Sequence, residues 1–351
     1  MSFLPSMPAN FVSVDSPTWT THHPKTSNLQ PHNPSPPTAL YYSNFWRYLI
    51  TPIALVAFPL VLLVTIICSV CYCIFKKKTF QELVAKLGLL ALSANTKKLD
   101  EIRTKHIDNQ ISTTTSDGIE LNGIKIDNGK EKWIVALNGT TGTWEHNIDG
   151  LNRMSDHLNA NVICFNYRGV GASKGYCKSS DELILDGIAM VKHLLDKGIK
   201  EEDIIIYGHS LGGGVGAQLM LHYKKIKFIS DRSFASFKEA AVAFFWIPVY
   251  RGIIANTLNI WWKLDSYEAI KNQKDRTLII VTHQDYIINF HASLYYAFTK
   301  RKETPPITIS MEYPIAKNLS CLSRCNELGR THVWETTKEI FQHSITLLTT
   351  K

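Results

Sequence analysis

One serine of the sequence stands in a pattern that can support nucleophilic catalysis. Residues 208–212 read Gly-His-Ser-Leu-Gly, with an apolar run before them and a glycine-rich stretch of helical periodicity after them. A strand that turns sharply into a helix through G-x-S-x-G holds the serine hydroxyl above a sheet, and the turn is too tight for side chains at the glycine positions. We predict that Ser210 is a nucleophile in an elbow formed with Gly208 and Gly212.

Such a serine needs a base and an acid that orients the base. In this arrangement the acid follows the nucleophile along the chain and the histidine comes last. Asp285 follows the apolar run 278–282, and His332 precedes the last helical pattern. We predict Asp285 and His332 for these roles, with Asp231 as the competing acid and a helix cap as the structural alternative for Asp285. The competing bases are His283 and His291.

An oxyanion hole for this chemistry takes two backbone N–H groups. The residue after the nucleophile supplies one, which predicts Leu211. The second donor is expected in the loop 139–144, rich in small residues, that follows the apolar run 133–137, and we assign it to Thr140, with Thr141 as the alternative by one position.

The elements that must position these residues follow from the apolar periodicity. Residues 112–126 alternate around an Asp-Gly turn, which predicts a hairpin. Strand and helix patterns then alternate, which predicts an α/β fold with a mostly parallel sheet and helices on both faces. The expected strands are 133–137, 162–165, 204–207, 228–230, 278–281 and 307–311, and the expected helices are 180–195, 215–223 and 291–299.

Five ordered motifs together resemble the α/β-hydrolase superfamily over residues 113–351. They are Asn138-Gly-Thr-Thr-Gly142, Asn166-Tyr-Arg-Gly-Val-Gly-Ala-Ser-Lys-Gly175, Gly208-His-Ser-Leu-Gly212, Asp285 and His332. An anchor preceding such a domain also resembles an uncharacterised chlamydial family of membrane hydrolase-like proteins. The chain departs from many lipases at Asn138, where they have His, and in the long segment 313–330 before His332.

Relatives in this superfamily carry a cap in the interval corresponding to residues 234–265. Here it contains apolar and aromatic residues over 240–262, which suit an acyl-binding lid or a membrane-dipping segment. The structural alternative is a helix buried over the sheet.

Residues 48–75 contain no charged residue. As a helix they would rise about 42 Å, more than the roughly 30 Å of a hydrocarbon core, which predicts one transmembrane helix within 46–78. Lysines 76–78 and 86 follow the run while only Arg47 closely precedes it, so the positive-inside rule places the hydrolase domain on the cytoplasmic side of a single-pass membrane protein. A cleaved signal peptide and a buried core helix are the weaker alternatives.

The flanks of the predicted span differ in character. Residues 1–45 are rich in Pro, Ser, Thr and Asn without apolar periodicity, which predicts disorder. Residues 79–112 form a linker in which 80–102 has apolar residues at helical spacing with bases nearby. That amphipathic helix can lie on an anionic membrane surface or pack on the hydrolase domain, and the sequence favours neither.

Charge and cysteine usage exclude other classes. The 351 residues carry a net charge of +8, but half of the excess lies within 76–112 and no basic stripe covers the main domain, so we expect no nucleic-acid partner. The 7 cysteines form no disulfide framework, and Cys321 and Cys325 lack the second pair of a metal site.

These features together predict a membrane-anchored serine hydrolase of the esterase, lipase or thioesterase class. Its substrate would be a carboxylic ester or thioester, such as an acyl lipid, with no metal or organic cofactor. Two alternatives stay open: an acyltransferase with the same triad, and a catalytically silent anchored scaffold that binds a lipid or a protein.

Overall fold

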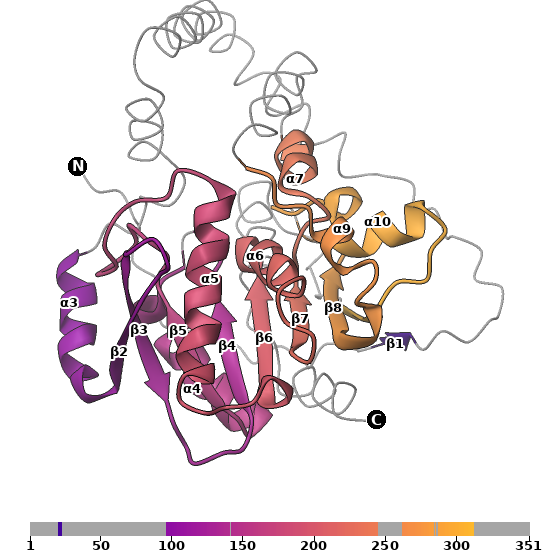
Figure 1. Ribbon diagram of the computed structural model, residues 1–351. Coiled ribbons are helices and arrows are strands. Elements are labelled where there is room, and N and C mark those ends of the chain that lie inside the picture. The colour runs from indigo at the N-terminus through magenta and orange to yellow at the C-terminus, as the bar shows by residue number, and fades with distance from the viewer. Residues whose placement is uncertain are drawn as a thin grey trace, which may run out of the picture.

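The computed structural model describes residues 20–22, 96–140, 142–244, 262–283, 285 and 287–311. In this part of the chain one sheet has the strand order β1-β9-β8-β7-β6-β4-β5-β3-β2 (Figure 1). Strands β4 to β9 are mutually parallel, which confirms the predicted mostly parallel sheet. The strands are β1 Thr20–His22, β2 Gln110–Thr114, β3 Glu120–Ile126, β4 Trp133–Leu137, β5 Asn161–Phe165, β6 Ile204–His209, β7 Lys227–Asp231, β8 Thr277–Thr282 and β9 Ile307–Met311.

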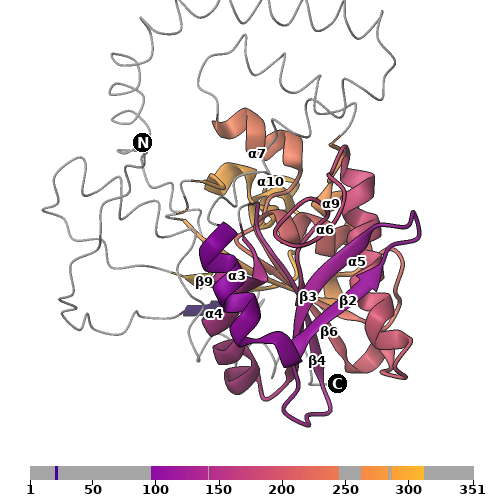
Figure 2. The same ribbon diagram turned by 90° about the vertical axis from the view of Figure 1, so that its left-hand side faces the viewer.

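Helices cover both faces of this sheet. The described α-helices are α3 Thr96–Lys105, α4 Trp144–Leu158, α5 Ser180–Leu195, α6 Leu211–Leu219, α7 Phe237–Phe244, α9 Ser266–Ile270 and α10 Leu294–Lys300. Figure 2, a view from the β2 edge, shows α3 and α4 on one side of the strands and α5 and α6 on the other. Successive residues of β4 therefore enter opposite cores, Ile134 toward α4 and Val135 toward α5 and α6. Burial on both faces explains the uninterrupted apolar strands.

The opening hairpin agrees with the sequence prediction. β2 and β3 pair antiparallel, and the Gly118 N–H bonds to the Thr115 carbonyl at 2.9 Å in the turn between them. Gly118 has a φ of +83°, a conformation that glycine adopts without strain. β2 begins at Gln110, so the folded domain starts before residue 113.

Helix α6 begins earlier than the predicted 215–223, directly after Ser210. Glycine runs have low helix propensity, which hides this helix from a propensity argument. The glycines are needed for close packing instead, because a Cβ on Gly213 would lie 2.4 Å from the Ser233 Cβ and one on Gly216 would lie 2.5 Å from the Phe228 ring.

Strand β1 lies within the segment predicted to be disordered. Thr20–His22 pair antiparallel with β9, so the prediction for 1–45 is wrong at these three residues. The physical reason is that an edge strand offers unpaired main-chain groups, and an extended segment can bond to them without any apolar side-chain pattern.

Helix α3 covers the described end of the juxtamembrane segment. It packs against α4, with Leu99 buried and Ile102 against the core on the α4 face. None of the helices described here is long and apolar enough to cross a membrane. The predicted span 48–75 and residues 79–95 lie outside the described residues.

Candidate active site

Ser210 occupies the turn between β6 and α6, which Figure 1 shows at the upper end of β6. Its φ of +52° and ψ of −115° lie outside the regions that residues with a side chain normally adopt. Hydrogen bonds hold this strained turn: the Ser210 N–H donates to the Asp231 carbonyl at 3.0 Å, and the Ser233 hydroxyl donates to the Ser210 carbonyl at 2.8 Å. The turn has the backbone features of a nucleophile elbow.

The two flanking glycines are required by the backbone around them. A Cβ on Gly208 would lie 2.4 Å from the Gly212 carbonyl oxygen, and one on Gly212 would lie 2.1 Å from the Leu137 carbonyl oxygen. Real Cβ atoms do not approach backbone so closely, so any larger residue would force the elbow away from β4. The roles predicted for Gly208 and Gly212 have this steric basis.

The loop after β4 lies directly against the elbow. A Cβ on Gly139 would be 3.3 Å from the His209 ring and 3.4 Å from the Ser210 Cβ. The Gly142 N–H bonds to the Gly139 carbonyl at 3.1 Å, so the loop forms a turn that contains Thr140. Leu211 is the first residue of α6, where a backbone N–H has no partner within the helix. Both predicted oxyanion donors thus come from backbone segments beside Ser210, while Thr141 lies outside the described residues.

Asn138, which replaces the histidine of many lipases, is buried behind this loop. Its amide nitrogen donates to the Cys164 Sγ at 3.3 Å, and its Oδ1 accepts from the Asn147 amide on α4 at 2.9 Å. Burial raises the pKa of the Cys164 thiol to about 12, although the bond from Asn138 opposes the rise. This side chain therefore braces the loop against β5 and α4.

Asp285 follows the end of β8, on the strand next to β7. It is buried, and its Oδ1 accepts the main-chain N–H groups of Ile287 and Ile288, both at 2.9 Å. These bonds are of the capping type that was the structural alternative for this residue. They also fix the direction of the carboxylate, which suits an orienting acid.

Asp231, the competing acid, ends β7 and is fully buried. Its Oδ2 accepts from the Tyr207 hydroxyl at 2.6 Å, from His209 Nδ1 at 3.1 Å and from Arg232 Nη2 at 2.7 Å, while Arg232 Nε bonds to Oδ1 at 2.8 Å. Burial alone would raise the pKa of Asp231, but the Arg232 charge and the bond from His209 outweigh it and hold the pKa well below its usual range. Both oxygens serve an internal ion pair, so this geometry disfavours Asp231 as the triad acid.

The sequence analysis did not anticipate the partners of Asp231. Tyr207 and His209 point to the same face of β6 because they are two residues apart, and His209 is directly opposite Asp231 in the β6–β7 register. The register of two strands cannot be read from the sequence, so this contact was not predicted. Through its contact with Asp231, His209 helps to hold the turn that contains Ser210.

Several predicted site residues lie outside the part of the chain that the structure describes. They include the base His332 and the cysteines Cys321 and Cys325. His283 stacks on the Phe290 ring with centroids 3.9 Å apart, and His291 bonds to Asn289. In the described residues no group of three or more His, Cys, Asp or Glu side chains could hold a metal ion.

The family described as "Chlamydia CHLPS protein (DUF818)" matches residues 43–286, more than half of the chain. The chain belongs to this family. The matched range includes the predicted span, the elbow and Asp285, and it ends before His332.

Other similarities agree on the fold. The Arabidopsis thaliana "Alpha/beta hydrolase domain-containing protein WAV2" is 27% identical over 251 residues, which cover 67% of this chain and 80% of that protein. The Pyrococcus furiosus esterase Pf2001 is 22% identical with a TM-score of 0.50, covering 68% of this chain and 89% of that one. An α/β-hydrolase from Vibrio vulnificus is 21% identical with a TM-score of 0.49, covering 63% and 80%. Together with the mostly parallel sheet, the similarity to Pf2001 shows that the domain has the α/β-hydrolase fold.

Proposed function

We propose that this chain is a serine hydrolase that cleaves a carboxylic ester or thioester. The observation that carries the proposal is the strained backbone of Ser210 between β6 and α6, with Gly139 so close that an added Cβ would lie 3.4 Å from the Ser210 Cβ. A buried strained turn is costly to maintain and is typical of catalytic sites. The nearby buried carboxylate of Asp285, held by main-chain N–H groups, supports the same reading.

In the proposed reaction His332 takes the proton of the Ser210 hydroxyl as the oxygen attacks the carbonyl carbon. The N–H groups of Leu211 and Thr140 stabilise the oxyanion, and the alcohol or thiol leaves with the proton from His332. Water then attacks the acyl-enzyme with His332 as base, and Asp285 holds the imidazole in the required tautomer. These residues suffice for the chemistry without a metal or an organic cofactor.

A fluorophosphonate probe tests this function on the full chain. Labelling of the wild-type protein that disappears in Ser210→Ala, together with loss of p-nitrophenyl ester turnover, would support it. An unlabelled, inactive wild-type protein would instead favour the silent scaffold. Transfer of the acyl group to an added alcohol in preference to water would favour the acyltransferase.

The substrate class is inferred from two apolar stretches of the sequence. We propose an acyl lipid, because the cap interval 234–265 is rich in aromatic residues and the segment 48–75 is suited to a membrane. Each buried methylene contributes about 0.8 kcal/mol, so each added pair of carbons should raise kcat/KM roughly tenfold until the acyl pocket is full. A p-nitrophenyl ester series measures this, and a preference for acetate would exclude the lipid assignment while leaving the triad.

The membrane anchor is a separate part of the proposal. We propose that residues 48–75 hold the protein at a membrane with the hydrolase domain on the cytoplasmic side. Deleting residues 1–78 should release the protein from the membrane pellet after an alkaline carbonate wash. A deletion variant that stays in the pellet would assign membrane binding to the segment 240–262 instead.

A further inference from the structure

Helix α4 begins directly behind the loop that contains Thr140, and its first turn carries a fully buried carboxylate. The Glu145 side chain has 0% exposure. Its Oε2 accepts from the Asn166 amide at 2.8 Å. A buried carboxylate needs a compensating cation as well as hydrogen bonds.

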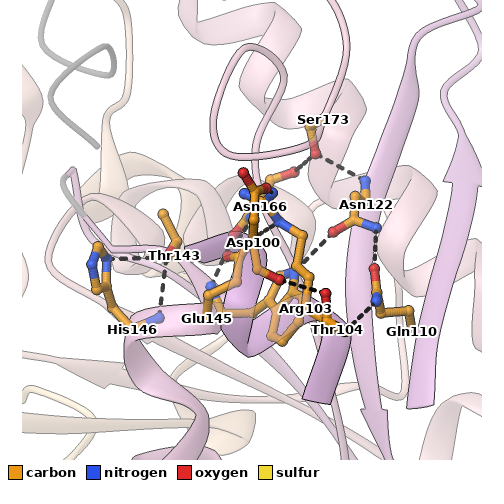
Figure 3. Close-up of polar contacts among 11 residues, drawn as sticks. Asp100, Arg103, Thr104, Gln110, Asn122, Thr143, Glu145, His146, Asn166 and Ser173 are labelled. Carbon is orange, nitrogen blue, oxygen red and sulfur yellow. Dashed lines mark hydrogen bonds and ion pairs between the residues drawn. The ribbon is translucent and has the colours of Figure 1, made fainter. Parts of the chain in front are cut away.

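That cation comes from helix α3. Arg103 Nε donates to Glu145 Oε1 at 2.7 Å, and Arg103 Nη1 bonds to Asp100 one turn earlier on α3. Figure 3 shows Arg103 between these two carboxylates. The main-chain carbonyl of Arg103 also accepts from the Gln110 amide at 2.8 Å, which ties the end of α3 to β2.

The same network fixes both ends of the oxyanion loop. At the far end, the Trp144 N–H donates to the Asn166 Oδ1 at 2.9 Å, so one asparagine bonds to both Trp144 and Glu145. At the near end, Asn138 is bonded to Asn147 on the next turn of α4. The loop is short, so a shift of the α4 N-terminus must move the backbone of Thr140.

Little space is left around the Glu145 carboxylate. A Cβ on Gly171 would lie 2.5 Å from the Asn166 amide nitrogen and 3.2 Å from Glu145 Oε1. The Ser173 hydroxyl, between the Asn166 carbonyl and the Asn122 N–H at 2.8 and 2.9 Å, holds the other side of this asparagine (Figure 3). Asn166 therefore holds one oxygen of Glu145 and Arg103 holds the other. Without the arginine from α3, the carboxylate would keep only the bond to Asn166.

We propose that Arg103 is a positioning residue for the oxyanion hole, acting through Glu145 on the backbone of the loop that contains Thr140. The assignment rests on the proposed serine hydrolase function. It gives α3, which precedes β2 in the chain, a role in positioning the proposed oxyanion donors. Oxyanion donors act on the transition state more than on the bound substrate, so the effect belongs in kcat.

The test compares variants of the full chain with p-nitrophenyl butyrate as substrate and a trifluoromethyl ketone as tetrahedral analogue. Removing one oxyanion donor costs about 10²- to 10³-fold in kcat, so a displaced donor in Arg103→Gln should lower kcat by roughly 10- to 100-fold with little change in KM. Affinity for the ketone should fall by the same factor. Arg103→Lys keeps the charge and should recover part of the loss, but not the second bond to Asp100.

Two control variants separate positioning from stability. Arg276→Gln removes a half-buried arginine that directly precedes β8 and whose Nη1 bonds to the main-chain carbonyls of Tyr223 and Ile226, at the opposite end of the parallel strands from Ser210. It should lower the melting temperature comparably and leave kcat unchanged. Lys105→Ala removes an exposed cation from the same end of α3 and should change neither.

The outcomes separate a failure of the proposed function from a failure of the positioning role. Absence of Ser210-dependent turnover in the wild-type protein would overturn the proposed function itself. With an active wild-type protein, an Arg103→Gln variant of unchanged kcat and ketone affinity would overturn the positioning role. Equal losses of kcat in Arg103→Gln and Arg276→Gln would also overturn it, since the effect would then follow stability.

Discussion

Two carboxylates end neighbouring strands of the sheet, and their surroundings differ in kind. Asp231 bonds through both oxygens to side chains, including the bidentate Arg232. Asp285 is held by main-chain N–H groups at Oδ1. A side-chain cation that bonds to both oxygens occupies a carboxylate, whereas main-chain N–H groups at one oxygen orient it. The comparison disfavours Asp231 as the triad acid, and Asp285 stays the predicted one.

The largest expected effect is on turnover by Asp285→Asn. The amide keeps the shape of the carboxylate but favours the wrong imidazole tautomer, so kcat should fall about 10⁴-fold. Steady-state kinetics with a p-nitrophenyl ester measures this, and circular dichroism checks that the fold is retained. A residual activity close to that of the wild type would transfer the acid role away from Asp285.

The next effect is on stability, in Asp231→Asn. Removing this charge leaves Arg232 buried without its counter-ion, which should lower the free energy of unfolding by about 3–5 kcal/mol. Urea denaturation measures the loss. The folded fraction should keep turnover within a few-fold of the wild type, and a loss as large as that of Asp285→Asn would invert the comparison.

A smaller loss of stability is expected in Tyr207→Phe. The variant removes only the hydroxyl that donates to Asp231 at 2.6 Å, so it should cost about 1.5–3 kcal/mol of unfolding free energy. Thr277→Val is a control, since it removes a buried hydroxyl bonded to a neutral main-chain carbonyl, that of Gln273. A loss in Tyr207→Phe no larger than in this control would mean that the ion pair gains little from the tyrosine.

The smallest effect concerns pH. Since the pKa of Asp231 is lowered in the folded protein, its contribution to stability is present above the usual aspartate range near 4 and is lost as the pH falls through the folded-state value. Asp117, whose pKa the bond from Arg168 lowers to about 2 against the effect of burial, adds a loss of the same sign. Between pH 5 and 3 the free energy of unfolding should therefore change less steeply with pH in Asp231→Asn than in the wild type, as urea denaturation at each pH would measure. An equally steep change in both proteins would contradict the ion-pair assignment.

Local sequence patterns predicted much of the fold. The apolar runs that became β4, β5, β6 and β8 are continuous because both faces of the sheet are covered, and α5 begins and ends where its periodicity predicted. Helix α4 was missed, although Trp144, Ile148, Leu151 and Leu158 are spaced for one buried face. Its first residue, Trp144, lies in the segment that the sequence predicts as a loop.

The candidate site was predictable only where its residues are close in sequence. Gly208, Ser210 and Gly212 form one turn, so a local motif carries its own geometry. The pairing of His209 with Asp231 depends on the register of two strands, and that of Arg103 with Glu145 depends on how α3 packs. Neither leaves a periodic signal in the sequence, because each joins residues far apart in the chain.

The pairing of β1 with β9 has a topological consequence for the anchor. A chain that crosses a bilayer once has its two ends in different compartments, so residues 20–22 could not reach β9 if 48–75 made a single crossing. If the pairing of β1 holds and residues 48–75 enter a bilayer as we propose, both ends of that segment would have to emerge on the same side. In sealed vesicles, a protease would then reach an N-terminal epitope and the hydrolase domain together, or spare both. If it digests one and spares the other, a single crossing has excluded the pairing.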